Sequence, residues 1–154
     1  MILMCAITGC ANKEKPDLNM PWKPFGFEGL LEKVNFIIVE DSRNCGYHNL
    51  LTDEGRNSYD YGFDCVIESD ELGVPFFIGT VRLPHDSYAY EVTIRDENSE
   101  YWFITYDKIT WAENENQLWV DICKQAKFTL GVDEISDCRK IVGIDWEKGG
   151  SVVQ

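Results

Sequence analysis

Three consecutive strand patterns between residues 76 and 106 constrain the fold more than any other feature. The middle pattern, 88–95, alternates with a period of two, which is typical of a strand with two different faces. One face takes Tyr88, Tyr90, Val92 and Ile94, and the other takes Ala89, Glu91, Thr93 and Arg95. Turn formers at 84–87 and 96–99 separate it from strand patterns at 76–83 and 100–106. Because short turns join antiparallel neighbours, we expect the three segments to form a meander.

A helix is expected over residues 58–72, before the meander. Its apolar residues fall at i, i+4, i+7 and i+8, which is one helical face: Tyr59, Phe63, Val66 and Ile67. Ser58 suits the N-cap of this helix. Gly73 suits the left-handed residue that ends a helix, and Pro75 prevents continuation.

Further strands are expected at 33–40, which is rich in β-formers, and at 117–123, which alternates. The turn formers of 41–57 predict a loop, whereas 133–146 fits either a short helix or a strand. Together the patterns predict an α+β fold. In it, one main helix packs on a mostly antiparallel sheet, a meander of roughly four to six strands.

The first residues of the chain have features of an export signal. Residues 2–7 are apolar, and the run ends in Ile7-Thr8-Gly9-Cys10. This ending resembles the lipobox of bacterial lipoproteins, in which a small residue precedes the cysteine that receives the lipid. The resemblance implies that 1–9 is a signal-peptide remnant and that Cys10 is the lipidated first residue of the mature chain. The alternative for the same residues is a buried first strand with a core cysteine.

The segment that follows is expected to be a tether. Residues 10–27 hold three of the five prolines of the chain, which favour an extended backbone. In Gram-negative lipoproteins the residue after the lipidated cysteine helps to sort the protein, and Ala11 at that place implies the outer membrane. No other stretch approaches the roughly 18 apolar residues of a spanning helix. We therefore expect a cell-envelope protein held to the membrane by its lipid.

Four cysteines remain when Cys5 is removed with the signal and Cys10 carries the lipid: Cys45, Cys65, Cys123 and Cys138. An even number in an exported domain predicts two disulfides, for which three pairings exist. Closeness in sequence favours Cys45–Cys65 and Cys123–Cys138. A zinc site is the alternative, although no CxxC or HxxxH spacing supports it.

A second resemblance covers about half of the chain. The order Cys45-Gly46, Cys65 on a helix, Gly73-x-Pro75-Phe76, Tyr106-Asp107 and Cys123 is similar to a pattern in uncharacterised small exported bacterial domains. This resemblance implies that the helix precedes the meander, and it carries no activity with it. We expect one globular domain over 28–148 and a frayed tail at 149–154.

The chain is strongly acidic, with a net charge of −13. A field of that sign repels phosphate backbones, which argues against nucleic acid as a partner. A basic protein is the partner that the charge favours, although acidity also serves solubility alone.

No catalytic constellation is evident in the sequence. His85-Asp86-Ser87 holds the residue types of a hydrolase triad, but consecutive residues of a turn cannot converge as such a triad does. His48 lies near Cys45, which we expect in a disulfide. The sequence also gives no phosphate loop, no calcium-loop spacing and no other sign of a cofactor or metal.

Aromatic residues gather in the expected sheet. Most should form the core, but an exposed set would make an interaction surface. The candidates are Tyr88, Tyr90, Trp102 and Tyr106. The resulting hypothesis is a membrane-anchored, non-enzymatic module of the envelope that binds, inhibits or gives immunity against a protein or peptide. The alternatives are an envelope hydrolase using carboxylates or His48, and a cytoplasmic acidic domain if the lipobox interpretation fails.

Overall fold

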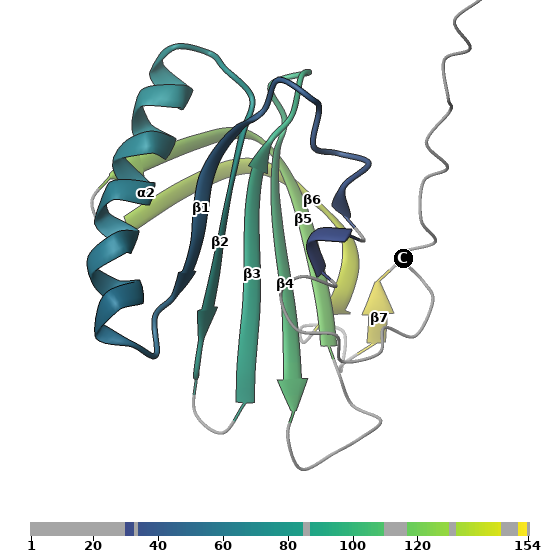
Figure 1. The fold of residues 1–154 in the computed structure, drawn as a ribbon. Helices are drawn as coiled ribbons and strands as arrows, with labels where there is room; N and C mark the ends of the chain where they lie inside the picture. Colours follow the sequence, from purple (N-terminus) through teal and green to yellow (C-terminus); the bar gives the residue numbers. More distant parts are fainter. Residues whose placement is uncertain are drawn as a thin grey trace, which may run out of the picture.

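A computed structural model describes residues 30–32, 34–84, 87–109, 117–129, 132–145 and 151–153. Seven strands and one long helix follow a short helical stretch, which is described at 30–32 and 34 (Figure 1). In chain order they are β1 Arg43–Asn49, α2 Asp53–Glu71, β2 Phe76–Arg82, β3 Ser87–Arg95, β4 Tyr101–Ile109, β5 Gln117–Thr129, β6 Val132–Asp145 and β7 Ser151–Val153. Cys10 and the tether at 10–27 lie outside the described residues.

The strands are ordered in the sheet as they are in the chain, from β1 to β7. Each neighbouring pair from β2 onward is antiparallel, whereas β1 and β2 are parallel. Parallel neighbours need a long crossover connection, and α2 supplies it. The α+β class with one main helix is therefore confirmed, but the sheet is not a pure meander.

The segment 33–40 was predicted to be a strand, and this is wrong. Around it the chain forms a helical turn and then irregular turns, and Val34 and Ile37 are 0% and 6% exposed. Its apolar side chains are buried against one face of the sheet, so tertiary packing overrides their strand propensity.

The first strand instead lies at 43–49, inside the segment predicted as a loop. This strand is poor in β-formers and gains its order from the backbone of β2. The amide of Arg43 donates to the carbonyl of Pro75 at 2.8 Å, and the amide of Leu50 donates to Val81 at 3.0 Å. Turn-forming residues at an edge are thus held extended by their neighbour.

Helix α2 begins at Asp53, five residues before the predicted start. The hydroxyl of Thr52, rather than that of Ser58, caps it by accepting from the amide of Gly55 at 3.0 Å. Gly55 lets the helix approach β1, because a Cβ there would lie 1.9 Å from the carbonyl oxygen of Asn49. The predicted end is confirmed, since Gly73 follows the helix with φ +70°.

The later strands agree with the patterns that predicted them, although β4 and β5 extend further than the expected 100–106 and 117–123. The sequence left both a short helix and a strand possible for 133–146, and the structure forms strand β6 there. The tail was expected to fray, but residues 151–153 pair with β6 as strand β7. Among the described residues, no helix is both long and apolar enough to span a membrane.

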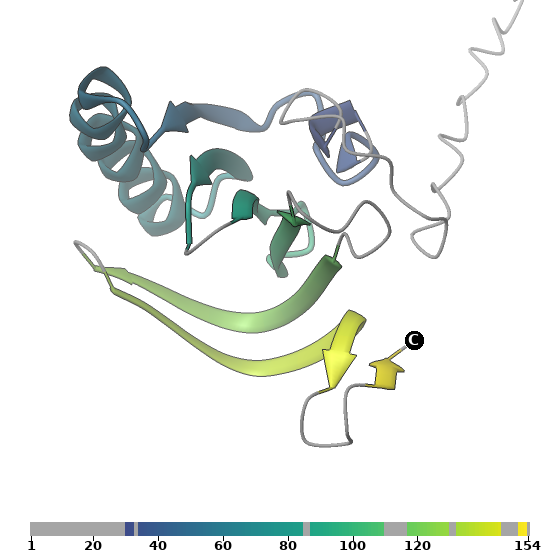
Figure 2. The same cartoon turned by 90° about the horizontal axis from the view of Figure 1, so that it is seen from below.

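Each face of the sheet has its own cover, and the two covers lie on opposite sides (Figure 2). The segment 30–38 covers one face and α2 covers the other. The paired β5 and β6 bend toward the side on which α2 lies, so that Phe128 reaches Phe63 with ring centroids 6.3 Å apart. The cover on the first face joins a cluster of buried residues: Leu30, Val34, Ile37, Val92, Ile94, Ile104, Tyr106 and Val120.

Two disulfides are present, and they are the pairs that closeness in sequence favoured. Cys45–Cys65 ties β1 to α2, and Cys123–Cys138 ties β5 to β6. The prediction of disulfides is confirmed. Each loop closed is short, at 20 and 15 residues, and restricting the unfolded chain in this way stabilises by about 3 kcal/mol per bridge.

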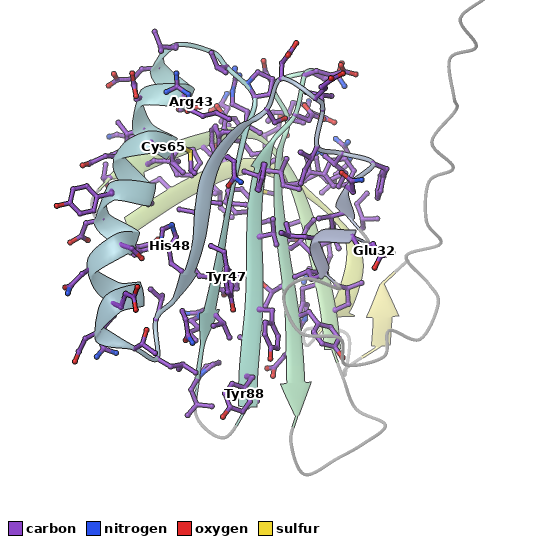
Figure 3. The ribbon with its side chains drawn as sticks, in the orientation of Figure 1. Glu32, Arg43, Tyr47, His48, Cys65 and Tyr88 are labelled. Carbon is purple, nitrogen blue, oxygen red and sulfur yellow. A yellow bond between two sulfur atoms is a disulfide. The ribbon has the colours of Figure 1, made fainter. Side chains whose placement is uncertain are left out.

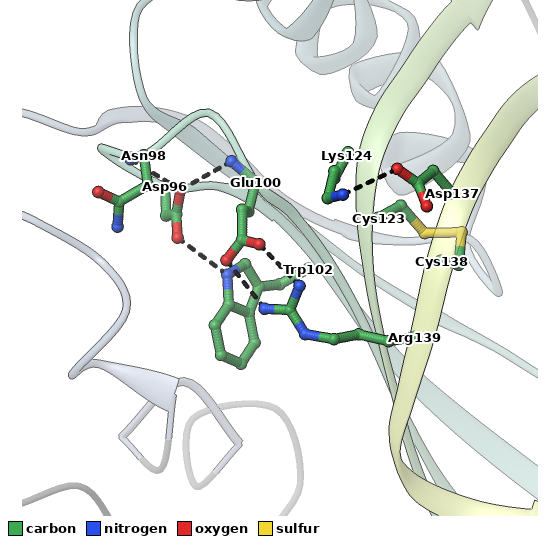
Figure 4. Close-up of polar contacts among 9 residues, drawn as sticks. All are labelled: Asp96, Asn98, Glu100, Trp102, Cys123, Lys124, Asp137, Cys138 and Arg139. Carbon is green, nitrogen blue, oxygen red and sulfur yellow. Dashed lines mark hydrogen bonds and ion pairs between the residues drawn. A yellow bond between two sulfur atoms is a disulfide. The ribbon is translucent and has the colours of Figure 1, made fainter.

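The turn between β3 and β4 is organised by Asp96 (Figure 4). One carboxylate oxygen accepts from the amides of Asn98 and Glu100, both at 2.9 Å, and the other accepts from the indole of Trp102 at 3.1 Å. Beside the turn, Arg139 of β6 donates to both oxygens of Glu100, which lowers the pKa of that carboxyl. The tertiary structure thus links a local turn to a distant strand.

Candidate functional site

A cavity of about 300 Å³ lies between α2, the sheet and β5. This volume is at the lower end for pockets that bind small ligands. Its walls come from α2, from β2, β3 and β4, and from Phe128 at the far part of β5. We call it the α2 cavity.

The floor of the α2 cavity is polar and comes from the strands. Cross-strand register places Thr80 opposite Glu91 and Glu91 opposite Thr105. The Thr80 hydroxyl donates to one Glu91 oxygen at 3.3 Å, and Arg82 forms an ion pair with the other. The hydroxyls of Thr93 and Thr105 have no hydrogen-bond partner among the described residues. The floor therefore offers two unused hydroxyls beside a neutralised ion pair.

The roof of the α2 cavity is aromatic. Tyr59 and Phe63 stand one turn apart on α2 with ring centroids 5.7 Å apart, and Phe63 meets Phe128. Phe103 of β4 completes the aromatic lining. The helical spacing that predicted an apolar stripe on α2 therefore builds this roof, and Cys45–Cys65 fixes the helix above the floor.

His48 has a structural position. Its ring is 6% exposed, with Nδ1 2.9 Å from the Ser58 hydroxyl and Nε2 3.0 Å from the carbonyl oxygen of Cys45. Because a carbonyl only accepts, Nε2 carries a proton and donates it. Gly62 of α2 makes room for the ring, since a Cβ there would lie 2.2 Å from Nε2. Both ring nitrogens are engaged and neither contacts a carboxylate within the described part of the chain; His85 lies outside that part.

The four aromatic residues predicted as an interaction surface lie mostly in the core. Tyr106 is 2% exposed, and Tyr90 and Trp102 pack against the same cluster. Burial, with Tyr90 nearby, raises the pKa of Tyr106 to about 12. Only Tyr88 is exposed, at 37%. Three of the four candidates therefore belong to the core, where most of the aromatic residues were expected, because residues 30–38 cover the face that these side chains occupy.

The outward face of α2 carries an acidic stripe. Asp60, Asp64, Glu68 and Glu71 follow one another at i, i+4, i+8 and i+11, and all four are exposed. Tyr61 lies beside them and is 79% exposed. Figure 3 shows oxygen-tipped side chains projecting from α2 away from the sheet. Glu68 pairs with Arg43 at 2.9 Å, whereas Asp60 and Asp64 have no ion pair among the described residues.

Sequence reasoning missed both the α2 cavity and the acidic stripe. The signal for the stripe was present, because the acids of α2 repeat with helical spacing opposite the apolar face. The alternation in β3 predicted that Glu91 and Thr93 lie on the face opposite the apolar residues of that strand. Only the tertiary structure shows that α2 and Phe128 lie over this face. In the described residues, no group of three or more His, Cys, Asp or Glu side chains is arranged to hold a metal ion.

No family model matches the chain, no curated protein matches it in sequence, and no solved structure matches its fold.

Proposed function

We propose that the protein is a membrane-anchored module of the cell envelope that binds a basic protein or peptide through the outward face of α2. The acidic stripe at Asp60, Asp64, Glu68 and Glu71 carries the proposal. Complementary charge steers association and suppresses partners of the wrong sign. Tyr61 supplies the exposed aromatic contact that protein interfaces favour.

The acidic stripe is not explained by the stability of the helix. Like charges four residues apart destabilise a helix by roughly 0.2–0.5 kcal/mol per pair, and Asp60, Asp64 and Glu68 form two such pairs. The last turn has no basic residue and contains Glu68 and Glu71, which the helix dipole disfavours. The ion pair with Arg43 offsets the cost of Glu68, but the other carboxylates of the stripe cost stability where they stand, which supports a role in recognition.

The helix that presents the stripe is rigidly held. Cys45–Cys65 fixes its middle, and Gly55 and Gly62 seat it closely on β1. At its far end, Tyr101 donates to Asp70 at 2.6 Å, which ties the last turn to β4. A surface ordered before binding loses less entropy when the partner arrives.

Anchoring through Cys10 belongs to the same proposal. Two disulfides support an oxidising compartment, and the lipobox-like residues that end at Cys10 would provide the anchor, at the outer membrane if the host is Gram-negative. The intact mass of protein from its native host tests this part. We expect a chain that starts at Cys10 with acyl groups and without free thiols, and loss of the acyl groups in Cys10→Ser. An unprocessed chain with six free thiols would contradict it.

Binding is tested with lysozyme as a basic probe, and with a lysine-rich and a glutamate-rich peptide, by titration at two salt concentrations. We expect the domain to bind the basic probes and Asp60→Lys/Asp64→Lys to weaken binding by about tenfold. The matched control is Glu32→Lys/Glu40→Lys, which changes the net charge equally at exposed positions in the segment before β1, whose residues 30–38 cover the opposite face of the sheet. Equal loss in both variants, or no binding of any basic probe, would contradict the proposal.

A hydrolase centred on His48 is not supported. Its ring nitrogens are used by Ser58 and Cys45, and the ring does not line the α2 cavity.

A further inference from the structure

The α2 cavity has two chemically different sides, and no part of the proposed function uses it. Tyr59 and Phe63 face it from the helix, and Thr93 and Thr105 face it from the strands. An apolar group buried against the roof gains transfer free energy in proportion to its area, at about 25 cal/mol per Å². A polar group is stable in the same space only where it finds hydrogen-bond partners.

The polar partners are available on the floor. Glu91 has both oxygens engaged, one by Thr80 and one by Arg82. The hydroxyls of Thr93 and Thr105 are not engaged among the described residues. Each hydroxyl can both donate and accept, so a ligand hydroxyl or amide could bond to either without breaking the ion pair.

The lining sets the charge of the ligand. Arg82 and Glu91 are the charged side chains of the lining, and they neutralise each other. A ligand with a net charge would lose hydration in the cavity without a free counter-charge to replace it. A neutral ligand does not meet this penalty.

We infer that the α2 cavity binds a small neutral amphiphile, with an aromatic or branched apolar body against the aromatic roof and a hydroxyl or amide head at Thr93 and Thr105. The site is separate from the acidic stripe, because the roof residues point from α2 toward the sheet and the stripe points away from it.

Matched probes test the inference by protein-observed NMR titration. The probes are benzyl alcohol, toluene, benzylamine and benzoate, which share a ring and differ in the head group. We expect benzyl alcohol to give saturable shifts at the amides of β3 and β4 that floor the cavity. Toluene should bind several-fold more weakly, and the two charged probes at least tenfold more weakly.

Isosteric variants locate the head group. Thr93→Val and Thr105→Val each remove one hydroxyl and keep the shape of the side chain. Each variant should therefore bind benzyl alcohol more weakly, with an affinity closer to that for toluene, and should bind toluene as tightly as the unchanged protein does. Thr129→Val is the matched control, because Thr129 is exposed and does not line the cavity. Equal affinity for the charged probes, absence of saturable shifts with benzyl alcohol, or shifts on the face covered by 30–38 would overturn the inference.

This test is independent of the proposed function. Asp60→Lys/Asp64→Lys should leave benzyl alcohol binding unchanged, and the two threonine variants should leave lysozyme binding unchanged. Loss of both activities in either variant would overturn the separation of the two sites.

Discussion

The two faces of the sheet use the same strands but are filled differently. On one face, segment 30–38 lies on a close-packed cluster in which Val34 and Ile94 are fully buried. On the other face, α2 and β5 enclose the α2 cavity above a floor of threonines and an ion pair. A helix 19 residues long spans the sheet as a stiff rod, whereas an irregular segment can follow its surface. The irregular cover closes a packed face, whereas α2 packs on a cluster of its own, which includes Val66, Phe76 and Ile78, and leaves the α2 cavity beside that cluster.

The largest expected difference comes from removing a buried side chain on each face. Ile94→Ala should reduce the free energy of unfolding by about 3–4 kcal/mol, because it opens a void in a packed cluster. Ile78→Ala on the cavity face should cost about 2 kcal/mol, because that side chain already borders empty space. Urea unfolding of both variants measures the difference. A larger loss for Ile78→Ala would break the comparison.

Removing either disulfide should cost nearly the same stability, but only one of the two removals should change the α2 cavity. Cys45→Ala/Cys65→Ala and Cys123→Ala/Cys138→Ala should each lower stability by about 3 kcal/mol. Only Cys45→Ala/Cys65→Ala frees α2 from β1, so only this variant should bind benzyl alcohol more weakly. Thermal unfolding and NMR titration test this pair, and equal weakening by both would show that α2 is not held by its bridge.

Enlarging one buried side chain on each face of the sheet tests the same difference in packing with a smaller change in stability. Val120→Ile adds a methylene to the packed cluster and should cost about 1–2 kcal/mol. Val66→Ile places the same group at the wall of the α2 cavity and should change stability by less than about 0.5 kcal/mol. Both valines are almost fully buried, so burial alone predicts equal effects. Equal losses in urea unfolding would mean that the cavity wall is as tightly packed as the cluster.

The last expected effect appears only at alkaline pH and reports on the packed face. Burial raises the pKa of Tyr106 from 10.0 to about 12, so the folded state holds this proton more tightly than the unfolded state. Stability should therefore fall as the pH rises from about 10 to 12, since the unfolded state then binds fewer protons. Tyr106→Phe should reduce this fall, and Tyr61→Phe, at a side chain that is 79% exposed, should not. An identical alkaline profile in the two variants would count against the burial of Tyr106.

Local chemistry made some elements predictable from sequence. The alternation of 88–95 and its flanking turns specified the meander, because both the strand period and the turn residues act within a few positions of each other. The helical spacing of Tyr59, Phe63 and Val66 specified the buried face of α2, and Gly73 specified its end. The disulfide pairs also followed from closeness in sequence.

The remaining features depend on contacts between distant segments, and only the tertiary structure decided them. Residues 33–40 have strand propensity but reach more burial as a cover, while 43–49 become a strand because β2 offers them backbone partners. Thr52 rather than Ser58 caps α2, because Gly55 and Gly62 let the first turns of the helix fit against β1. The α2 cavity exists because β5 bends until Phe128 meets Phe63, a contact between residues 65 positions apart that no local pattern encodes.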